Sequence, residues 1–356
     1  MIGGKGAGIP DRFFSMNLLE QQAANRRKTW LIIFAFVAFL FVLGLGFDAF
    51  FLGAAGGSMP VGSVVALGVG SVSALVSYYG GDRAILVSTG ARPVADVAAG
   101  AADADRLKLH QLDNVVDEMA IAAGLPRPPA YVVPDADPNA FATGRDPAHA
   151  SIAVTRGLLD ALDREELQGV VAHEMSHIRN LDVRVMTIVA ALVGGVALLA
   201  DWARRGMMWG GGSRRRDEDR REGSGIAGLA LFVLWMVAVI VAPVVAQMLA
   251  MMVSRRREYL ADASGAELTR NPMGLARALE TIESAAAPTR SINRGSAHLC
   301  IADPLGRRMN LREGFWPNLF ASHPPMQARI SALRAMAFEH SDTIERTQNL
   351  EVKSST

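Results

Sequence analysis

Two histidines and a glutamate stand together at residues 173–177, which read His-Glu-Met-Ser-His. On an α-helix, His173 and His177 lie one turn apart on the same face, so both imidazole rings can bind one small divalent cation. Glu174 is placed to take a proton from a water molecule that the cation activates. These residue types at this spacing predict a metal-dependent hydrolytic site, provided that the stretch is helical.

The residues around this stretch predict the helix that the site requires. Asp163 followed by Glu166 is the capping-box pattern of a helix start. Apolar residues then recur at three-and-four spacing, and no proline interrupts them. Within a helix, His-Glu-x-x-His is the zinc-metalloprotease signature, although a five-residue match alone also arises by chance.

A later acidic pair, Glu258 and Asp262, supplies the ligand that the two histidines lack. The pair is four residues apart and shares one face of a predicted helix. Two histidines and a glutamate, with water in the fourth position, form the catalytic zinc site of thermolysin-like enzymes. Asp262 would then accept the ring N–H of a ligating histidine. The alternative is that both carboxylates only pair with the arginines at 255–257.

The composition of the 356-residue chain predicts a membrane protein. Half of the residues are apolar and the mean hydropathy is +0.21, which is high for a soluble protein. The net charge of +1 gives no argument for a nucleic-acid partner. Cys300 is the only cysteine, so the chain can form no internal disulfide.

Long apolar stretches divide the chain into segments. Residues 26–28 (Arg-Arg-Lys) precede the first stretch and predict a cytoplasmic N-terminus. We expect a cytoplasmic leader (1–28), a transmembrane hairpin (29–81), a first half of a globular domain with the His-Glu-x-x-His helix (82–182), a second hydrophobic hairpin (183–254), a second half with the third ligand (255–338) and a disordered tail (339–356). The arginine-rich linker at 204–222 would face outward if both later stretches crossed the bilayer, so the charge rule leaves the crossing of 183–253 open.

Two further stretches could contact a substrate. Residues 139–144 (Asn-Ala-Phe-Ala-Thr-Gly) lie between predicted strands at 131–133 and 151–154. They could form an exposed edge, beginning at Asn139, that binds a peptide as an added strand, or they could be an ordinary hairpin strand. His323 precedes Pro324 and Pro325 at the start of a predicted helix over 326–338. From there it could reach a reaction intermediate, or it could be a surface histidine.

In several motifs the chain resembles the HtpX-type membrane metalloproteases, relatives of the CAAX prenyl proteases. The shared motifs are the N-terminal hairpin, residues 139–144, 172–177 (Ala-His-Glu-Met-Ser-His), the hydrophobic insert, 257–266 (Arg-Glu-Tyr-Leu-Ala-Asp-Ala-Ser-Gly-Ala), and 322–325 (Ser-His-Pro-Pro) with Arg329 following. They occur in the family's order across about residues 25–338. The arginine-rich linker, the long leader and the polar tail depart from the family pattern, and none removes a predicted ligand.

The resemblance implies a mainly α protein with a small β-sheet (α+β), a zincin-like metalloprotease domain and two to four transmembrane helices. It implies one Zn²⁺ per chain, bound by His173, His177 and Glu258, with Glu174 as the base. Asp262 would support a ligand, and His323 would steady the tetrahedral intermediate. Such enzymes sit in the bacterial inner membrane with a cytoplasmic active site, and cleave misfolded or damaged membrane proteins in quality control and stress response.

Three other interpretations remain open from the sequence. A prenyl-protein protease would prefer C-terminal CAAX peptides to unfolded proteins. Two histidines and a carboxylate also bind the iron of non-haem oxygenases, although a glutamate next to the first histidine favours hydrolysis. A non-catalytic zinc-bearing scaffold or chaperone is the third, and the open coordination position argues against it. The sequence carries no signal for an oligomeric state.

Overall fold

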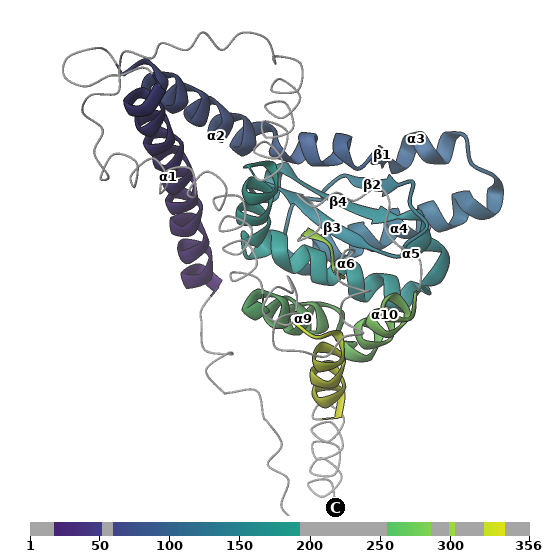
Figure 1. Cartoon of the computed structure of the whole chain (residues 1–356). Coiled ribbons are helices and arrows are strands. Elements are labelled where there is room, and N and C mark those ends of the chain that lie inside the picture. The colour runs from purple at the N-terminus through teal and green to yellow at the C-terminus, as the bar shows by residue number, and fades with distance from the viewer. Residues whose placement is uncertain (1–17, 52–59, 193–254, 286–298, 303–323, 339–356) are drawn as a thin grey trace, which may run out of the picture.

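The computed structural model describes residues 18–51, 60–192, 255–285, 299–302 and 324–338. In these residues a small sheet is surrounded by helices, and a long helical hairpin leads into it (Figure 1). The predicted mainly α architecture with a small β-sheet is confirmed. His323, the linker 204–222, the tail 339–356 and most of the second hydrophobic hairpin lie outside the described residues.

The sheet has four strands in the order β1-β2-β4-β3, with bounds Arg92–Pro93 (β1), Ala130–Val133 (β2), Ala140–Gly144 (β3) and Ala150–Thr155 (β4). β2 and β4 are parallel, whereas β1–β2 and β3–β4 are antiparallel. β3, which lies within residues 139–144, is therefore an edge strand and also pairs antiparallel with β4. Because side chains alternate along a strand, Ile152 and Val154 pack with the helices on one face, while Phe141 and Ala153 pack on the other.

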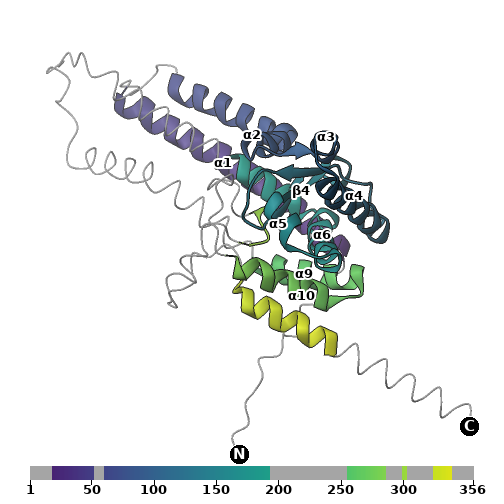
Figure 2. The same cartoon turned by 90° about the vertical axis from the view of Figure 1, so that its right-hand side faces the viewer.

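Helices form layers over this sheet. They are α3 (Val94–Ala99), α4 (Asp103–Ala123), α5 (Arg156–Ala161), α6 (Arg164–Arg179), α9 (Arg255–Thr269) and α10 (Pro272–Ser284), together with helical residues 182–192 and 326–338. Both views place α6 between the sheet and the pair α9 and α10 (Figures 1 and 2). The helix that carries the two histidines is thus enclosed on both sides, so its inward side chains are buried.

The local signals that predicted α6 are present in the structure. The Asp163 carboxylate accepts a hydrogen bond from the Glu166 backbone N–H, and the Glu166 carboxylate accepts one from the Asp163 N–H, which completes the capping box. α4 ends at Gly124, whose φ of 65° is the left-handed conformation that favours glycine. The helix predicted at 326–338 is also confirmed.

α1 (Leu18–Phe51) and α2 (Val61–Ser88) form the helical hairpin and are both long and apolar enough to cross a membrane (Figure 2). Most of the exposed large apolar side chains among the described residues lie on these two helices, including Phe34 and Val76. Asp48 interrupts the apolar run of α1. Its carboxylate is accommodated there because it accepts hydrogen bonds from the backbone N–H groups of Gly62 and Ser63, at 2.6 and 2.8 Å. These N–H groups begin α2 and have no partner within the helix.

The two ends of the hairpin both meet the sheet-containing part. Ile85 and Leu86, at the end of α2, pack against Phe141 of β3. α1 begins at Leu18, so residues 18–28, which the sequence assigned to a leader, continue the first hydrophobic helix. The described start of the second hydrophobic stretch, 183–192, is helical and largely buried.

Candidate metal centre

The close crossing of α6 and α9 creates the site. A Cβ atom on Gly265 of α9 would lie 3.1 Å from the backbone nitrogen of His173, so only glycine allows this approach without adjustment. The crossing sets the acidic face of α9, with Glu258 and Asp262, against the histidine face of α6. Residues that lie 81–89 positions apart in the chain thereby meet, which brings together the two histidines and the glutamate that the sequence suggested as ligands.

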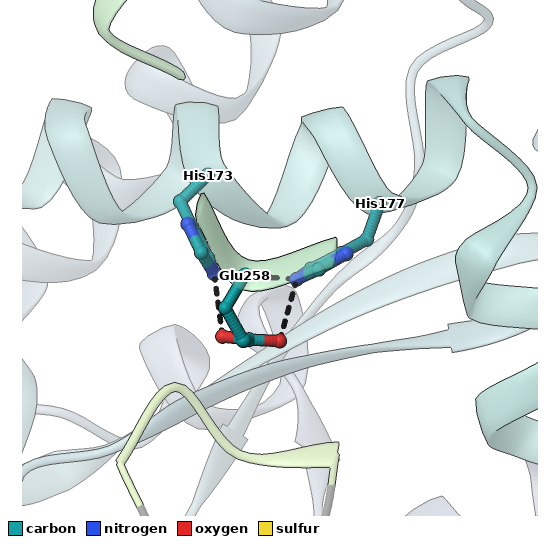
Figure 3. Close-up of side chains that lie close together, drawn as sticks. All are labelled: His173, His177 and Glu258. Atoms are coloured by element: carbon teal, nitrogen blue, oxygen red, sulfur yellow. Dashed lines mark hydrogen bonds and ion pairs between the residues drawn. The ribbon is translucent and has the colours of Figure 1, made fainter. Parts of the chain in front are cut away.

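His173, His177 and Glu258 converge on one point (Figure 3). The two Nε2 atoms are 3.2 Å apart, and they lie 3.6 and 3.7 Å from the two Glu258 carboxylate oxygens. Two nitrogens bound to one tetrahedral zinc ion at 2.0–2.1 Å would be about 3.3 Å apart. All three side chains are almost completely buried. The donor types and their spacing fit a small divalent cation.

On the other side of His173, its Nδ1 lies 3.0 Å from an Asp262 carboxylate oxygen. Asp262 is in turn held by Arg329, whose Nε and Nη2 donate to both of its oxygens at 2.8 and 2.7 Å. Arg329 also donates to the Ile301 carbonyl and is completely buried. Burial alone would raise the pKa of Asp262, but Arg329 holds it below its usual value. The carboxylate behind His173 is therefore charged and fixed.

The charge around His173 also changes its own titration. Burial would lower the pKa of this imidazole, but the Asp262 and Glu258 carboxylates outweigh burial and raise the pKa to about 9. Cation binding must displace a proton from this ring, because only the neutral imidazole nitrogen is a ligand.

A second carboxylate lies behind His177, and the sequence analysis missed it. Asp182 has one oxygen 3.4 Å from His177 Nδ1 and is almost completely buried. Its other oxygen accepts a hydrogen bond from Asn25 of α1 at 2.8 Å and lies 3.8 Å from Arg257. The available signal was an aspartate five residues after His177 at the start of an apolar stretch.

Glu174 is almost completely buried beside the two histidines. Burial raises the pKa of its carboxyl, Glu258 adds to this, and His173 and His177 oppose it. Neither oxygen accepts a hydrogen bond of normal geometry from the described residues, although the Ala142 backbone N–H is near enough to lower the pKa. A carboxylate with a raised pKa and few fixed partners suits a group that gains and loses a proton.

Asn139 is completely buried and does not itself present an open edge. Its side-chain amide donates to the Ala302 carbonyl at 3.0 Å, and the Ile301 N–H donates to the Ala140 carbonyl at 2.9 Å. Residues 299–302 are therefore fastened to the start of β3 without forming the regular strand that their apolar sequence resembles. The edge beyond this fastening begins at Ala142, beside Glu174.

The model of Peptidase family M48 matches residues 106–337, which is more than half of the chain. The chain belongs to peptidase family M48. The protease HtpX homolog of Caldanaerobacter subterraneus is 42% identical over 90% of this chain and 98% of its own length. The protease HtpX homolog of Streptococcus gordonii is 39% identical over 90% of this chain and all of its own length. The predicted resemblance to HtpX-type proteases is thereby confirmed.

Among solved structures, S. mikatae Ste24p matches 88% of this chain and 67% of its own, with a TM-score of 0.43 and 16% identity. M48 membership, HtpX-type relatives across nearly the whole chain and the two apolar helices together make this a membrane-bound metalloprotease with protein substrates. The family's metal requirement agrees with the donor set of His173, His177 and Glu258.

Proposed function

We propose that the chain is a membrane-anchored zinc endopeptidase in which His173, His177 and Glu258 bind one Zn²⁺ and Glu174 is the catalytic base. The observation that carries this proposal is the buried convergence of two Nε2 atoms and one carboxylate next to Glu174. When bound, zinc acts as a Lewis acid that makes water a nucleophile near neutral pH and polarises the scissile carbonyl.

Glu174 performs the proton transfers. Its carboxylate takes one proton from the attacking water as the new C–O bond forms, and passes that proton to the amide nitrogen as the C–N bond breaks. The raised pKa brings this carboxyl closer to the working pH, where a group can both accept and release a proton. His323, by its motif position, is proposed to stabilise the negative charge on the carbonyl oxygen.

The substrate is proposed to bind along β3 as an added strand. Ala140 and Gly144 direct backbone groups away from β4. The Ala140 carbonyl accepts a hydrogen bond from the Ile301 N–H, and the Gly144 N–H donates to the Thr187 hydroxyl. Alternation along the strand points the Ala142 backbone groups the same way, towards Glu174. A peptide paired at Ala142 would present a backbone carbonyl next to the base. Asn139 contributes by fastening residues 299–302 beside this edge.

The anchor supports a two-pass hairpin with the catalytic domain in the cytoplasm of a bacterial inner membrane. Asn25 of α1 and Ile85 of α2 both contact the catalytic part, so both ends of the hairpin lie on one side. Arg26, Arg27 and Lys28 are exposed at that end, as the positive-inside rule predicts for a cytoplasmic side. We propose misfolded or damaged membrane proteins as substrates, in quality control and stress response.

The test uses the full chain purified in detergent with a chelator and reloaded with stoichiometric zinc. We expect Glu174→Gln to bind one zinc, as the wild type does, and to lose about 10²–10⁴-fold in cleavage of an unfolded protein. Glu165→Gln, the same change at an exposed site on α6, is the matched control and should retain activity. Equal activity of wild type and Glu174→Gln would remove Glu174 as the base.

Other outcomes separate the remaining interpretations. Cleavage of C-terminal CAAX peptides but not of unfolded proteins would indicate a prenyl-protein protease. Preference for Fe²⁺ over Zn²⁺ when the metal-free chain is offered both ions would favour an oxygenase. Zinc in both variants with no cleavage of any substrate by either would indicate a zinc-bearing scaffold. Absence of zinc from both would contradict the ligand set.

A further inference from the structure

The carboxylate behind His177 is held by the membrane anchor. Asn25 of α1 is only 4% exposed, and its Nδ2 donates to Asp182 Oδ1 at 2.8 Å and to the Asn180 carbonyl at 2.9 Å. The other Asp182 oxygen, Oδ2, is the one that lies 3.4 Å from His177 Nδ1. The chain of contacts therefore runs from a hydrophobic helix, through one aspartate, to a candidate metal ligand 152 positions later in the sequence.

The backbone after α6 is bent so that Asp182 can occupy this position. α6 ends at Arg179, and Leu181 adopts a φ of 58°, the left-handed region that non-glycine residues rarely occupy. A further helix then begins at 182. The bend at Leu181 brings Asp182 back towards His177, which lies two residues before the end of α6. An unfavourable backbone conformation persists when contacts around it hold it in place. Here Asn25 contacts the residues on both sides of Leu181, which are Asn180 and Asp182.

We propose that Asp182 is a positioning residue for His177 and that Asn25 holds Asp182 in place, so that α1 is part of the metal centre as well as an anchor. This inference rests on the proposed role of His177 as a ligand. Asp182 accepts the Nδ1–H of His177, which fixes the tautomer that leaves Nε2 free to bind the cation. Because the second Asp182 oxygen is held by Asn25, loss of that amide would let the carboxylate turn away.

The same face of α1 offers a matched control. Gln22, one turn before Asn25, donates from Nε2 to the Arg179 carbonyl at 2.8 Å. Gln22→Ala and Asn25→Ala each remove one amide that docks α1 on the end of α6, but only Asn25 contacts Asp182. A purely structural role of α1 would make the two variants alike, whereas positioning of His177 through Asp182 would not.

The experiment measures zinc affinity by competition with a chromogenic chelator. It uses the full chain in detergent, carrying Glu174→Gln so that no proteolysis interferes. We expect Asp182→Asn to weaken zinc binding about 10–100-fold and Asn25→Ala about tenfold, whereas Gln22→Ala changes it less than about twofold. Substituted Co²⁺ should show altered absorption bands in Asp182→Asn and Asn25→Ala only. Thermal melting of the metal-free variants reports whether each one is folded.

A double-mutant cycle makes the inference falsifiable even if one variant is unstable. In the Asp182→Asn background, Asn25→Ala should add less than about twofold, because its partner is already altered. Equal affinity losses for Asn25→Ala and Gln22→Ala would overturn the inference, as would a lower melting temperature of Asn25→Ala with unchanged affinity. If the Glu174→Gln parent binds no zinc, the proposed function fails instead, so the two failures are distinct.

Discussion

The two histidines of the candidate metal centre are supported in different ways. Behind His173, Asp262 makes two charge-assisted hydrogen bonds with the completely buried Arg329. Behind His177, Asp182 is contacted by the neutral amide of Asn25, with Arg257 at 3.8 Å. The first side is built within the catalytic part by α9 and the helix at 326–338. The second side uses the membrane helix α1, so it is complete only when the anchor is docked.

The largest expected effect comes from a substitution that removes the arginine on the His173 side. Arg329→Leu leaves Asp262 charged and buried without its partner, and removing one member of a buried pair costs about 3–5 kcal/mol. The melting temperature of the metal-free protein should therefore fall by several degrees. Arg334→Leu, on the same helix, removes an exposed pair with Glu280 and should cost less than about 1 kcal/mol. Similar losses in both variants would show that the Asp262 clamp contributes no special stability.

Much of the His173 side can be predicted from sequence because its signals are local. The spacing of His173 and His177, the capping box at Asp163 and the i,i+4 pair of Glu258 and Asp262 each follow from helix geometry alone. Their meeting depends on the close crossing at Gly265, which no periodicity encodes. The sequence suggested their meeting only through the matching chemistry of two histidines and a carboxylate.

The His177 side could not be predicted in this way. Asn25 and Asp182 are separated by 157 positions, and each looks ordinary in its own stretch. Asn25 stands in a polar segment before the first apolar run, so composition assigned it to a leader. Asp182 follows a helix end at which the left-handed residue is Leu181, a residue type that gives no sign of this conformation. A contact between two such residues can be identified only from the folded structure.

The next prediction compares the two sides directly, by replacing the aspartate behind each histidine with asparagine. Asp262→Asn and Asp182→Asn should each weaken zinc binding about 10–100-fold, because each removes the negative charge behind a ligand. Only Asp262→Asn should also lower the metal-free melting temperature strongly, since it leaves Arg329 buried without its counter-charge. Chelator competition and thermal melting measure the two quantities. A larger stability loss for Asp182→Asn would reverse the proposed difference.

A pH series tests the charge on the His173 side. The pKa of His173 is raised from its ordinary 6.5 to about 9 in the folded, metal-free protein, after burial is outweighed by Asp262 and Glu258. Its contribution to metal-free stability is therefore fully present below pH 6.5 and is lost as the pH rises through about 9. Zinc affinity should change oppositely, rising by up to about tenfold per pH unit across this window, because a proton must leave the ring.

The same series contains its own control. Asp262→Asn removes one of the carboxylates that raise the His173 pKa, so the zinc affinity of this variant should reach its plateau at a lower pH than that of the wild type. A pH profile that Asp262→Asn leaves unchanged would assign the proton to another group.

The smallest expected effect tests whether zinc affinity depends on the groups behind each histidine or only on the stability of α6, the helix that carries both. Asp163→Ala removes the N-cap of α6, three turns from His173, and should cost about 1 kcal/mol of stability. Because α6 carries both histidines, this loss acts on both sides equally. The zinc affinity should change by less than about twofold once the variant is folded, since no group that contacts either ring has moved. A drop as large as that of Asp262→Asn would mean that any loosening of α6 disturbs the ligands, and the separate roles of Arg329 and Asn25 would then lose their support.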